Sequence, residues 1–538
     1  MSEGVVDAVV VGSGPNGLVA AITLALAGRS VVVVEAADSI GGGTRSAELT
    51  LPGFIHDVCS AIHPLGAGSP AMTALPLADH GLRWLHPEVA LTHPLDGGRA
   101  GHVERDLAAT AATLGGDGAP WQRHIGRLVA QWDELSPMVM RSLVQVPRHP
   151  LVLTRFGVPA LAPATWLGRR WFDGDEARAL FAGCAAHAFL PLSHPLSASF
   201  GMILLTSAHA VGWPVAEGGS QRIADALASL LASLGGRIET DRRITSLTEL
   251  PAHRCVLFDI APRPVAANAG DRLPGRFRTR LERFRHGPAA FKIDYALDGP
   301  VPWTNEVCRR AGTVHVGGSA DEVAVAEAEM AAGRHPDRPF VLVAQQSIVD
   351  PSRAPTGKHT LWAYCHVPNG SSIDMTAAIE RQIERFAPGF GDLVLARHTA
   401  GPAWMEAHNN AYIGGDIAGG AHTGLQVLFR PLIGRAYRTP NPSLLLCGAS
   451  TPPGGGVHGM CGRNAALTAL RGILRQLNPN FVGLDMLSLL RPTKFTDVRR
   501  CTVQLRATRA WLAKLRATGP SSEATTMSSS RMPHLPGT

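Results

Sequence analysis

A glycine-rich turn close to the N-terminus constrains the fold of this chain more than any other feature. The stretch VVVGSGPNGLVAA carries G-x-G-x-x-G at Gly12, Gly14 and Gly17, directly after an expected strand over Asp7–Gly12. The first glycine permits a tight turn, the second lets backbone approach a pyrophosphate, and the third packs helix against strand. A helix continuing over Leu18–Leu26 would offer its N-terminal N–H groups to phosphates. This pattern predicts a dinucleotide-binding turn.

The residues after this turn complete a βαβ unit. Val31–Val34 is expected to form a second strand, and Glu35 closes it with a carboxylate that can accept hydrogen bonds from a ribose and would repel a 2′-phosphate. A purely structural glycine turn is the weaker alternative, because strand, helix, second strand and acidic residue all fall at the required places. The residues expected to contact the dinucleotide here are Gly12, Gly14, Pro15, Asn16, Gly17, Glu35 and Ala36.

A second glycine run, Gly41–Gly43 in IGGGTRS, favours FAD over NAD. Backbone without side chains can lie against the pyrophosphate and ribityl chain of an extended FAD, which NAD-dependent dehydrogenases do not usually need. Gly42, Gly43, Thr44 and Arg45 are therefore expected FAD contacts. The glycine pair in TVHVGGSADEV lacks the rest of the dinucleotide pattern, so a separate NAD(P)H site is not expected.

Motifs along nearly the whole chain, to about residue 480, resemble those of one flavoprotein family. They are the Gly12–Glu35 unit, GGGTRS, LPGFIHDVCSAIHPL, GWPVAEGGSQRIADAL, FKIDYAL, GKHTLWAYCHVPNGS, GGDI and LLLCGASTPPGGGVHGMCGRNAA. With them the chain resembles the phytoene desaturase-like flavoproteins of the amine oxidase superfamily. It is most similar to the branch named pyridine nucleotide-disulfide oxidoreductase domain-containing protein 2.

The resemblance implies an α/β fold, with a Rossmann-like FAD-binding domain that is discontinuous in sequence and an inserted α+β substrate domain. The FAD-binding domain is expected at 1–75, 215–285 and 436–490, and the substrate domain at 76–214 and 286–435. The strand Leu444–Cys447 would deliver Gly448 to the ribityl chain. The turn Gly454–Gly456 and a helix from about Val457 would direct N–H groups at the flavin ring. A structural glycine turn that caps a helix is the alternative.

Two residues are candidates for chemistry beside the flavin, which itself accepts the hydride in such enzymes. Lys292 in FKIDYAL is similar in place to an amine oxidase lysine that contacts flavin N5 through a water; a solvent-facing strand lysine is the alternative. His458 directly follows the glycine turn, and a packing or turn-stabilising histidine is the alternative there. Gly456, Val457 and His458 complete the set of expected FAD contacts.

Several other residues are interpreted as structural. Trp404 is expected in the core rather than the pocket. Cys447 and Cys461 flank the flavin loop, but the amine oxidase pattern for a flavin-linking cysteine is absent, so the FAD is expected to be non-covalent. No metal site is predicted. Core or pocket-wall positions, rather than metal ligation, are expected for His187, His194 and His209.

The charge pattern argues against nucleic-acid binding. The formal net charge is +7 over 538 residues, and residues 491–516 hold eight basic side chains against one acid, Asp497, so the rest is near neutral. No run of about 18 apolar residues predicts a membrane span. The eight cysteines are isolated and the N-terminus resembles a strand rather than a signal peptide, so a reducing, cytoplasmic location is expected.

The C-terminal region departs from the resemblance after Leu477. Apolar or small side chains recur at helical spacing from Val498 to Leu515, which predicts a basic amphipathic helix over 491–518. Docking of this helix on the protein itself or on a sister subunit is one interpretation, which leaves a homo-oligomer open. Peripheral contact of 498–516 with an anionic membrane is the other. Residues 519–538 are rich in Ser, Pro and Thr and are expected to be disordered.

These observations lead to three hypotheses of function. The first is an FAD-dependent oxidoreductase that takes hydride from an apolar or amine-bearing small molecule in an apolar pocket of the substrate domain. The second, suggested by carotenoid-related relatives, is a redox-neutral flavin-dependent isomerase of a polyene or isoprenoid. The third is a flavin-binding regulatory or interaction protein with little turnover.

Overall fold

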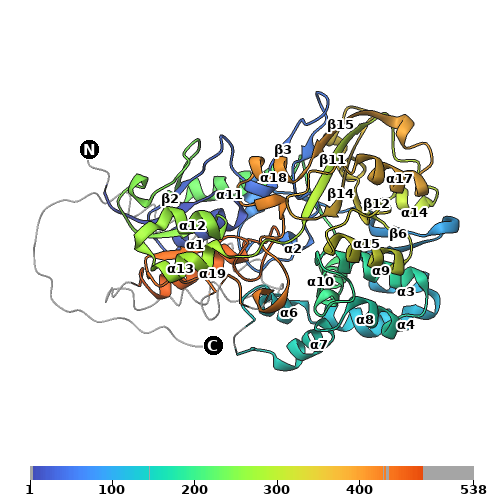
Figure 1. Ribbon diagram of the computed structural model, residues 1–538, viewed down its shortest axis with the longest axis horizontal. Coiled ribbons are helices and arrows are strands. Elements are labelled where there is room, and N and C mark those ends of the chain that lie inside the picture. The colour runs from blue at the N-terminus through green and yellow to red at the C-terminus, as the bar shows by residue number, and fades with distance from the viewer. Residues whose placement is uncertain (1–3, 144–145, 428, 432–435, 476–538) are drawn as a thin grey trace, which may run out of the picture. The chain divides into compact units, whose positions relative to one another are not determined.

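Within the described residues, a parallel sheet of five strands is the first structural layer (Figure 1). The structure is a computed structural model and describes residues 4–475, apart from 144–145, 428 and 432–435. All neighbouring strands run parallel. The residues of its strands Val6–Val11, Val31–Val34 and Leu444–Leu446 are almost wholly buried and mostly aliphatic, as is typical of parallel strands covered on both faces. In spatial order the strands are β16 (Leu444–Leu446), β10 (His253–Phe258), β1 (Val6–Val11), β2 (Val31–Val34) and β9 (Arg237–Glu239).

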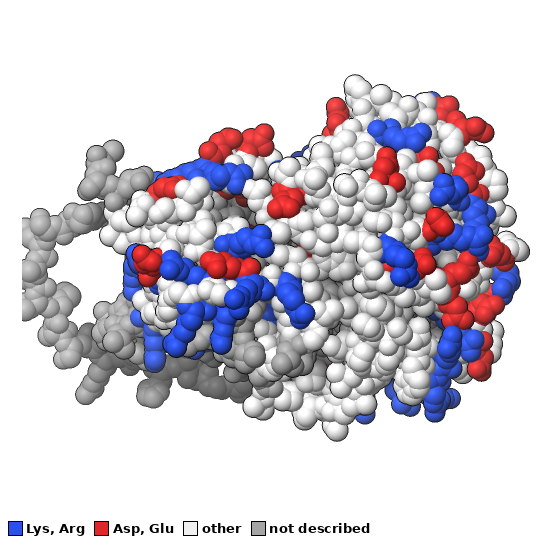
Figure 2. Space-filling view, viewed as in Figure 1, with Lys and Arg blue, Asp and Glu red and all other residues white. Residues whose placement is uncertain are grey.

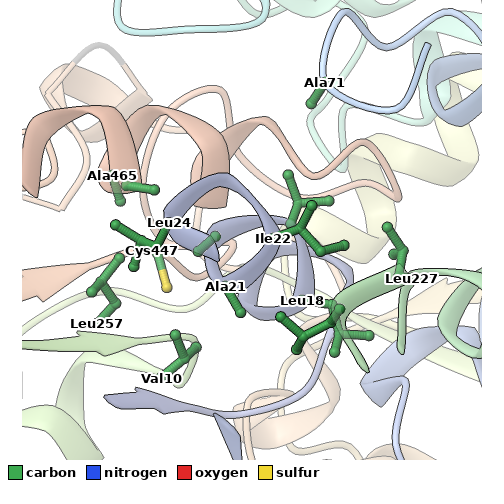
Figure 3. Packing of buried hydrophobic residues seen from close by; sticks show 14 of the residues in the cluster. Val10, Leu18, Ala21, Ile22, Leu24, Ala71, Leu227, Leu257, Cys447 and Ala465 are labelled. Atoms are coloured by element: carbon green, nitrogen blue, oxygen red, sulfur yellow. The ribbon is translucent and has the colours of Figure 1, made fainter. Parts of the chain in front are cut away.

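Helices cover both faces of this sheet. α1, α11 and α19 share a core with Val10 and Leu257 (Figure 3), whereas α12 and α13 pack against Val9 and Val32 on the opposite face. Successive strand residues point to opposite faces, so Val9 and Val10 belong to different cores. The bounds of these helices are α1 (Pro15–Leu26), α11 (Gln221–Ser233), α12 (Pro262–Ala269), α13 (Gly275–Glu282) and α19 (Met460–Arg471).

A mixed sheet of seven strands is the second layer of the described chain. It is antiparallel except between β6 and β12. One face packs on α17 (Thr376–Phe386), and the opposite face presents Ala290, Trp362 and Tyr364. In spatial order the strands are β15 (Val394–Ala400), β11 (Ala289–Leu297), β14 (His359–Val367), β13 (Val341–Ala344), β12 (Ala311–Val316), β6 (Val89–Pro94) and β7 (Ala100–Val103).

A group of helices from the first half of the chain packs beside β6 and β7 around its own apolar core (Figure 1). α15 (Ala320–Ala331) joins this core from the second half of the chain. The bounds of the group are α3 (Leu107–Thr113), α4 (Gly118–Trp121), α5 (Arg127–Val129), α6 (Trp132–Val139), α7 (Pro150–Ala160), α8 (Ala164–Trp171), α9 (Asp175–Ala186) and α10 (Ser197–Ala210). Shorter elements are β3 (Ser46–Ala47), β4 (His56–Asp57), α2 (Pro64–Ala67), β5 (Trp84–Leu85), β8 (Val215–Ala216), α14 (Glu306–Arg309), α16 (Gln346–Val349) and α18 (Pro402–His408).

The fold class predicted from the sequence is confirmed, with differences at several elements. The strands of the parallel sheet come from three separate stretches of chain, as expected for a discontinuous Rossmann-like domain. β9 is the strand that the described structure contains between residues 237 and 247, and the helix predicted from Val457 begins at Met460. Both sheets lie in one compact unit, so the predicted domain limits remain a proposal. The predicted helix 491–518 and tail 519–538 lie outside the described residues.

The two helices that follow the glycine turns, α1 and α19, pack directly on each other. A Cβ atom at Gly462 in α19 would lie 1.8 Å from the carbonyl oxygen of Asn16 in α1 and 3.0 Å from the Ala20 nitrogen. Real side chains do not tolerate such distances, so a glycine at this crossing lets the two backbones touch. The contact joins segments from opposite ends of the described chain.

We expect Gly462→Ala to lower the free energy of unfolding by about 1–3 kcal/mol, because the added methyl group meets backbone atoms that have no room to move. Urea denaturation measures the change. Gly275→Ala is the matched control, because Gly275 also lies in a helix and a Cβ there would meet nothing within 4 Å. The control should be neutral or slightly stabilising. Equal stability of the two variants would show that the crossing is looser than described.

Candidate functional site

One cleft of about 870 Å³ brings together both glycine turns of the sequence. Gly12–Asn16 line one part of it, and Gly448 and Gly455–Val457 line another. Residues from the seven-stranded sheet, including Lys292 and Trp362, line the far part. The part with Gly12 is called the nucleotide end below, and the part with Lys292 is called the ring end. The two remote turns therefore share a single site.

The nucleotide end is a helix N-terminus with a glycine cradle. Gly12 has φ +103°, and a Cβ at Gly17 would lie 2.1 Å from the Gly12 carbonyl oxygen, so the turn requires both glycines. Gly14 is the N-cap of α1 and brings no side chain of its own to this helix end, while the Gly17 N–H donates to the Asp259 carboxylate. Pro15 has no N–H, and Gly14, Pro15 and Asn16 line the cleft. The remaining backbone N–H groups of this helix N-terminus suit an anion.

The carboxylate of Glu35 is held in place beside this turn. Its Oε2 accepts hydrogen bonds from the Ser13 N–H at 2.9 Å and the Ser13 Oγ at 2.7 Å, and Oε1 accepts from the Ala37 N–H at 2.9 Å. Glu35 and Ala36 both line the cleft. A carboxylate fixed this way keeps acceptor capacity for a hydroxyl group in the cleft.

The predicted contacts Gly42–Arg45 also line the nucleotide end. A Cβ at Gly42 would lie 3.3 Å from the Gly14 Cα, so the two glycine turns touch. Arg45 does not point freely into the cleft, because its Nη2 donates to the His408 carbonyl oxygen at 2.6 Å. Tyr412, which the sequence analysis missed, reaches Gly43 so closely that a Cβ there would lie 2.1 Å from its hydroxyl.

Asp259 is the most important residue that the sequence analysis missed. It follows β10, and its Oδ2 accepts a hydrogen bond from the Gly17 N–H at 2.7 Å. A Cβ at Gly14 would lie 2.7 Å from Oδ2, and one at Gly448 would lie 3.2 Å from Oδ1. The carboxyl thus lies where both glycine turns meet. Its signal in the sequence was an acidic residue directly after a strand that neighbours β1.

The environment of Asp259 favours its protonated form. Burial raises the pKa of this carboxyl to about 7; the hydrogen bond from Gly17 lowers the pKa, and the negative charge of Glu35 raises it. Asp259 therefore changes charge near neutral pH at the position where phosphates would bind.

The second glycine turn is held from behind by a buried arginine. Arg430 is 1% exposed, and its Nη2 donates to the carbonyl oxygens of Gly419 at 2.8 Å and Gly420 at 2.9 Å. A Cβ at Gly454 would lie 2.6 Å from the Arg430 Nη1. This packing presents Gly455–Val457 to the cleft as exposed backbone. α19 starts three residues after Val457, which corrects the predicted helix start.

His458 lies behind this turn rather than in the cleft, so the prediction that it faces the ring system is wrong. It is 2% exposed, it is absent from the cleft wall, and its ring lies under Gly456. Its Nδ1 accepts a hydrogen bond from the Met460 N–H at 3.1 Å, at the start of α19. Burial lowers the pKa of His458 to about 4. His458 therefore matches the alternative of a histidine that stabilises the turn.

Lys292 lies in the wall of the ring end rather than facing solvent, and it is paired. The side chain is 1% exposed, and its ammonium group donates to the Asp294 carboxylate two residues along β11. The Lys292 Nζ also lies 5.8 Å from the centre of the Trp362 ring. The two carboxylate oxygens of Asp294 also lie 3.7 Å from histidine nitrogens: Oδ1 from the Nδ1 of His56, and Oδ2 from the Nδ1 of His398. Lys292 therefore belongs to a buried charge cluster.

The walls of the ring end are apolar and aromatic. Trp362 and Tyr364 project from one face of β14, next to Ala290 and Lys292 of β11. Their alternation in LWAYCHV was a signal that the sequence analysis did not use. α10 and the segment before it add the other wall. In the described chain the lining there consists of His187, Phe189, Phe200, Ile203, Leu204, Trp213, Thr313, Leu342, Ile417 and His422.

The remaining candidates divide between core and surface. Trp404 is half-buried, stacks on His408 and does not line the cleft. His187 lines the cleft with its Nε2 3.3 Å from the His315 Nε2, and His209 is a buried acceptor for the Trp121 Nε1. His194 is exposed, so its expected place in the core or pocket wall is wrong. It lies in a turn, directly before Pro195, rather than in a helix.

The thiols near the second turn are poor nucleophiles. Burial raises the pKa of Cys461 to about 11 and that of Cys447 still further, and neither lines the cleft. Cys59 does line it, and burial raises its pKa to about 11 as well. No group of three or more potential metal ligands occurs among the described residues. None of the described helices is long and apolar enough to span a membrane.

Comparison with known proteins gives a consistent set of relatives. A family model of the NAD(P)-binding Rossmann-like domain matches residues 10–75. The chain is 26% identical to the rat pyridine nucleotide-disulfide oxidoreductase domain-containing protein 2, over 86% of this chain and 93% of that protein. It is 25% identical to phytoene dehydrogenase of Streptomyces griseus, over 85% and 93%. The structure of putrescine oxidase bound to putrescine aligns with a TM-score of 0.55 at 17% identity, covering 88% of this chain and 99% of that one.

Proposed function

We infer the function of this chain from its homology to phytoene dehydrogenase and to pyridine nucleotide-disulfide oxidoreductase domain-containing protein 2, and from the fold it shares with putrescine oxidase. We propose an FAD-dependent oxidoreductase that takes hydride from a neutral, mainly apolar small molecule. The observation that carries this proposal is the single cleft in which both glycine turns meet Lys292 and an aromatic wall.

The residues of the cleft fit FAD along its length. The N-terminus of α1 and the glycines at 12, 14 and 42 would hold the pyrophosphate, and Glu35 would accept from the ribose. The exposed backbone of Gly455–Val457 would lie against the ring system. FAD, when bound, supplies the hydride acceptor. The buried thiols support non-covalent binding.

The charges of the cleft favour a neutral substrate over a cationic amine. The acidic side chains of its described lining all lie at the nucleotide end; they are Glu35, Asp38, Asp241 and Asp259. At the ring end, Lys292 is the formally charged side chain of the described lining. A protonated amine would meet the Lys292 ammonium there, and the nearby Asp294 carboxylate is already paired with that lysine. An apolar neutral molecule would bury its surface against the same walls.

Lys292 would contribute by position and charge. The Asp294 carboxylate pairs with the ammonium group and fixes it in the wall, and the ammonium lies over the Trp362 ring. A cation fixed beside the reacting ring favours negative charge that develops there.

Anaerobic mixing of the FAD-loaded protein with a substrate panel tests the proposal. We expect neutral apolar molecules to bleach the flavin absorbance, and protonated amines of similar size to bleach it at least about tenfold more slowly because of the unpaired charge. Faster reduction by the amines would refute the charge argument. Product formed without net bleaching would favour the isomerase hypothesis. Protein that is colourless and takes up no FAD would end the proposal.

A further inference from the structure

Large apolar side chains are exposed on α7, on α8 and in the segment before α7. Six of the eleven large apolar side chains that are exposed in the described structure fall within residues 143–166. The most exposed are Val146 at 89%, Leu151 at 74% and Val158 at 65%. The set, called the α7–α8 patch below, consists of Leu143, Val146, Leu151, Val158, Leu161 and Trp166.

The helix α7 shows the pattern most clearly, because it is apolar on both sides. Val152, Phe156 and Ala160 are buried against the helical core. Leu151 and Val158 lie seven residues apart on the opposite side, with Leu161 directly after the helix on the same side. Thr154 and Arg155 are exposed on this side as well. Clustered large apolar side chains on a surface normally mark a place where something binds. The described chain leaves this side uncovered.

The charge around the α7–α8 patch is of one sign. Residues 141–170 contain five arginines and no aspartate or glutamate. Among the described residues, only Arg169 forms an ion pair with an acidic side chain, Asp321. In the space-filling view the surface over α7 is mainly white and shows no red (Figure 2). The five arginines are Arg141, Arg148, Arg155, Arg169 and Arg170.

We propose that the α7–α8 patch is a docking surface for an anionic lipid bilayer. Exposed aliphatic side chains can enter the headgroup region, a tryptophan such as Trp166 is suited to the interface, and arginines attract anionic headgroups. A second copy of this chain fits less well, because a symmetric contact would bring the same unpaired arginines of both copies together. The proposal therefore commits to lipid.

The position of the patch links it to the cleft through one helix. α7 and α8 both pack on α10, whose buried Met202 and Leu205 belong to the same core. Phe200, Ile203 and Leu204 of that helix line the ring end. A bilayer on the patch would thus lie one helix away from the apolar part of the site. The docking proposal itself does not depend on the proposed oxidoreductase function.

Flotation of the full-length, FAD-loaded protein with lipid vesicles tests the proposal. We expect binding to vesicles that contain phosphatidylglycerol, much weaker binding to pure phosphatidylcholine, and weakening by salt. The variant Leu151→Ser/Val158→Ser/Trp166→Ser should bind at least about tenfold more weakly, because three apolar side chains no longer enter the bilayer. The variant Arg148→Gln/Arg170→Gln should bind anionic vesicles about fivefold more weakly for each arginine removed. Its binding to pure phosphatidylcholine vesicles should not change.

A matched control removes exposed apolar side chains elsewhere. Val325→Ser/Ile373→Ser/Leu395→Ser changes three residues that are 60%, 50% and 46% exposed, and should bind vesicles like the unchanged protein. Residues 498–516 are present in every variant, so their contribution cancels. Vesicle binding that the patch variants do not alter would overturn the proposal, and so would a wild-type protein that binds neither vesicle. A patch variant that changes only the oligomeric state in gel filtration would assign the surface to a second copy instead.

Discussion

Lys292→Met is expected both to destabilise the protein and to slow reduction of bound flavin, for separable reasons. Lys292 and Asp294 are 1% and 0% exposed. Removal of the ammonium group leaves a buried carboxylate without its cation, which costs about 3–5 kcal/mol. The same change removes the formal charge at the ring end, and we expect flavin reduction by a substrate to slow about 100-fold. Urea denaturation and anaerobic stopped-flow absorbance measure the two effects.

The double variant Lys292→Met/Asp294→Leu separates the two effects. With both charges gone, the core has no unpaired carboxylate, so most of the lost stability should return. Flavin reduction should stay slow if the lysine acts on the reaction. Recovery of both stability and rate in the double variant would instead mean that Lys292 only neutralises Asp294.

An exposed pair on the same sheet supplies the control. Lys358 pairs with Asp298, and the two side chains are 38% and 50% exposed. Because exposed pairs contribute little, Lys358→Met should change the free energy of unfolding by less than about 1 kcal/mol and leave flavin reduction unaltered.

The destabilisation of Lys292→Met should also depend on pH. Burial lowers the pKa of His56 to about 4, the negative charge of Asp294 raises it, and the Lys292 charge lowers it. Without Lys292, the His56 pKa rises, so His56 can take up a proton and pair with Asp294. The variant should therefore regain stability relative to the unchanged protein as pH falls towards about 5. A constant difference in stability across pH would argue that the charges are not coupled.

The local turns of the site could be predicted from the sequence, because their chemistry is encoded in contiguous residues. Gly12, Gly14, Gly17 and Glu35 follow a spacing that backbone geometry dictates, and all except Gly17 line the cleft. Contacts made by residues far apart in sequence could not be predicted in the same way. Asp259 enters the site only because β10 pairs with β1. Lys292 and Asp294 are close in sequence, but the significance of their pair depends on the burial of their strand face, which the spacing does not reveal.

His458 shows the limit of arguments from proximity in sequence. It directly follows the cleft-lining residues Gly456 and Val457, yet the tight turn rotates its side chain away from the cleft, where it accepts from Met460. A single residue after a glycine turn can point to either side, and the spacing does not decide which. The backbone arrangement behind the turn, which Arg430 holds, decides it.

Binding of FAD is expected to be coupled to proton uptake by Asp259. The Oδ2 atom is engaged by the Gly17 N–H, and the carboxyl lies between the glycines that would hold the pyrophosphate. The charged group that shifts its pKa from a neighbouring element is Glu35, which is also negative, and no cationic side chain of the described residues is among the groups that shift this pKa. The flanking thiols Cys447 and Cys461 have raised pKa values and stay neutral.

The sign of this coupling follows from the charges. The free carboxyl has a pKa of about 7, and an adjacent pyrophosphate, being negative, would raise it further. Above that pH the free site must take up a proton on binding, so affinity should fall as pH rises, by about tenfold for each unit of pKa shift. Below it the carboxyl is already protonated and affinity should be level. The pyrophosphate diester itself does not change charge near neutral pH.

Calorimetric titration with ADP-ribose, which carries the same pyrophosphate but no flavin, measures this directly. In buffers of different ionisation enthalpy near pH 8, the unchanged protein should take up close to one proton on binding, and Asp259→Asn should take up none and bind more tightly. An asparagine oxygen can still accept from the Gly17 N–H, so the turn is kept. Asp38→Asn is the control, because Asp38 lines the same cleft but is exposed, and it should behave like the unchanged protein. Binding without proton uptake in the unchanged protein would mean that the Asp259 carboxylate stays ionised and faces hydroxyl groups of the ligand rather than its phosphates.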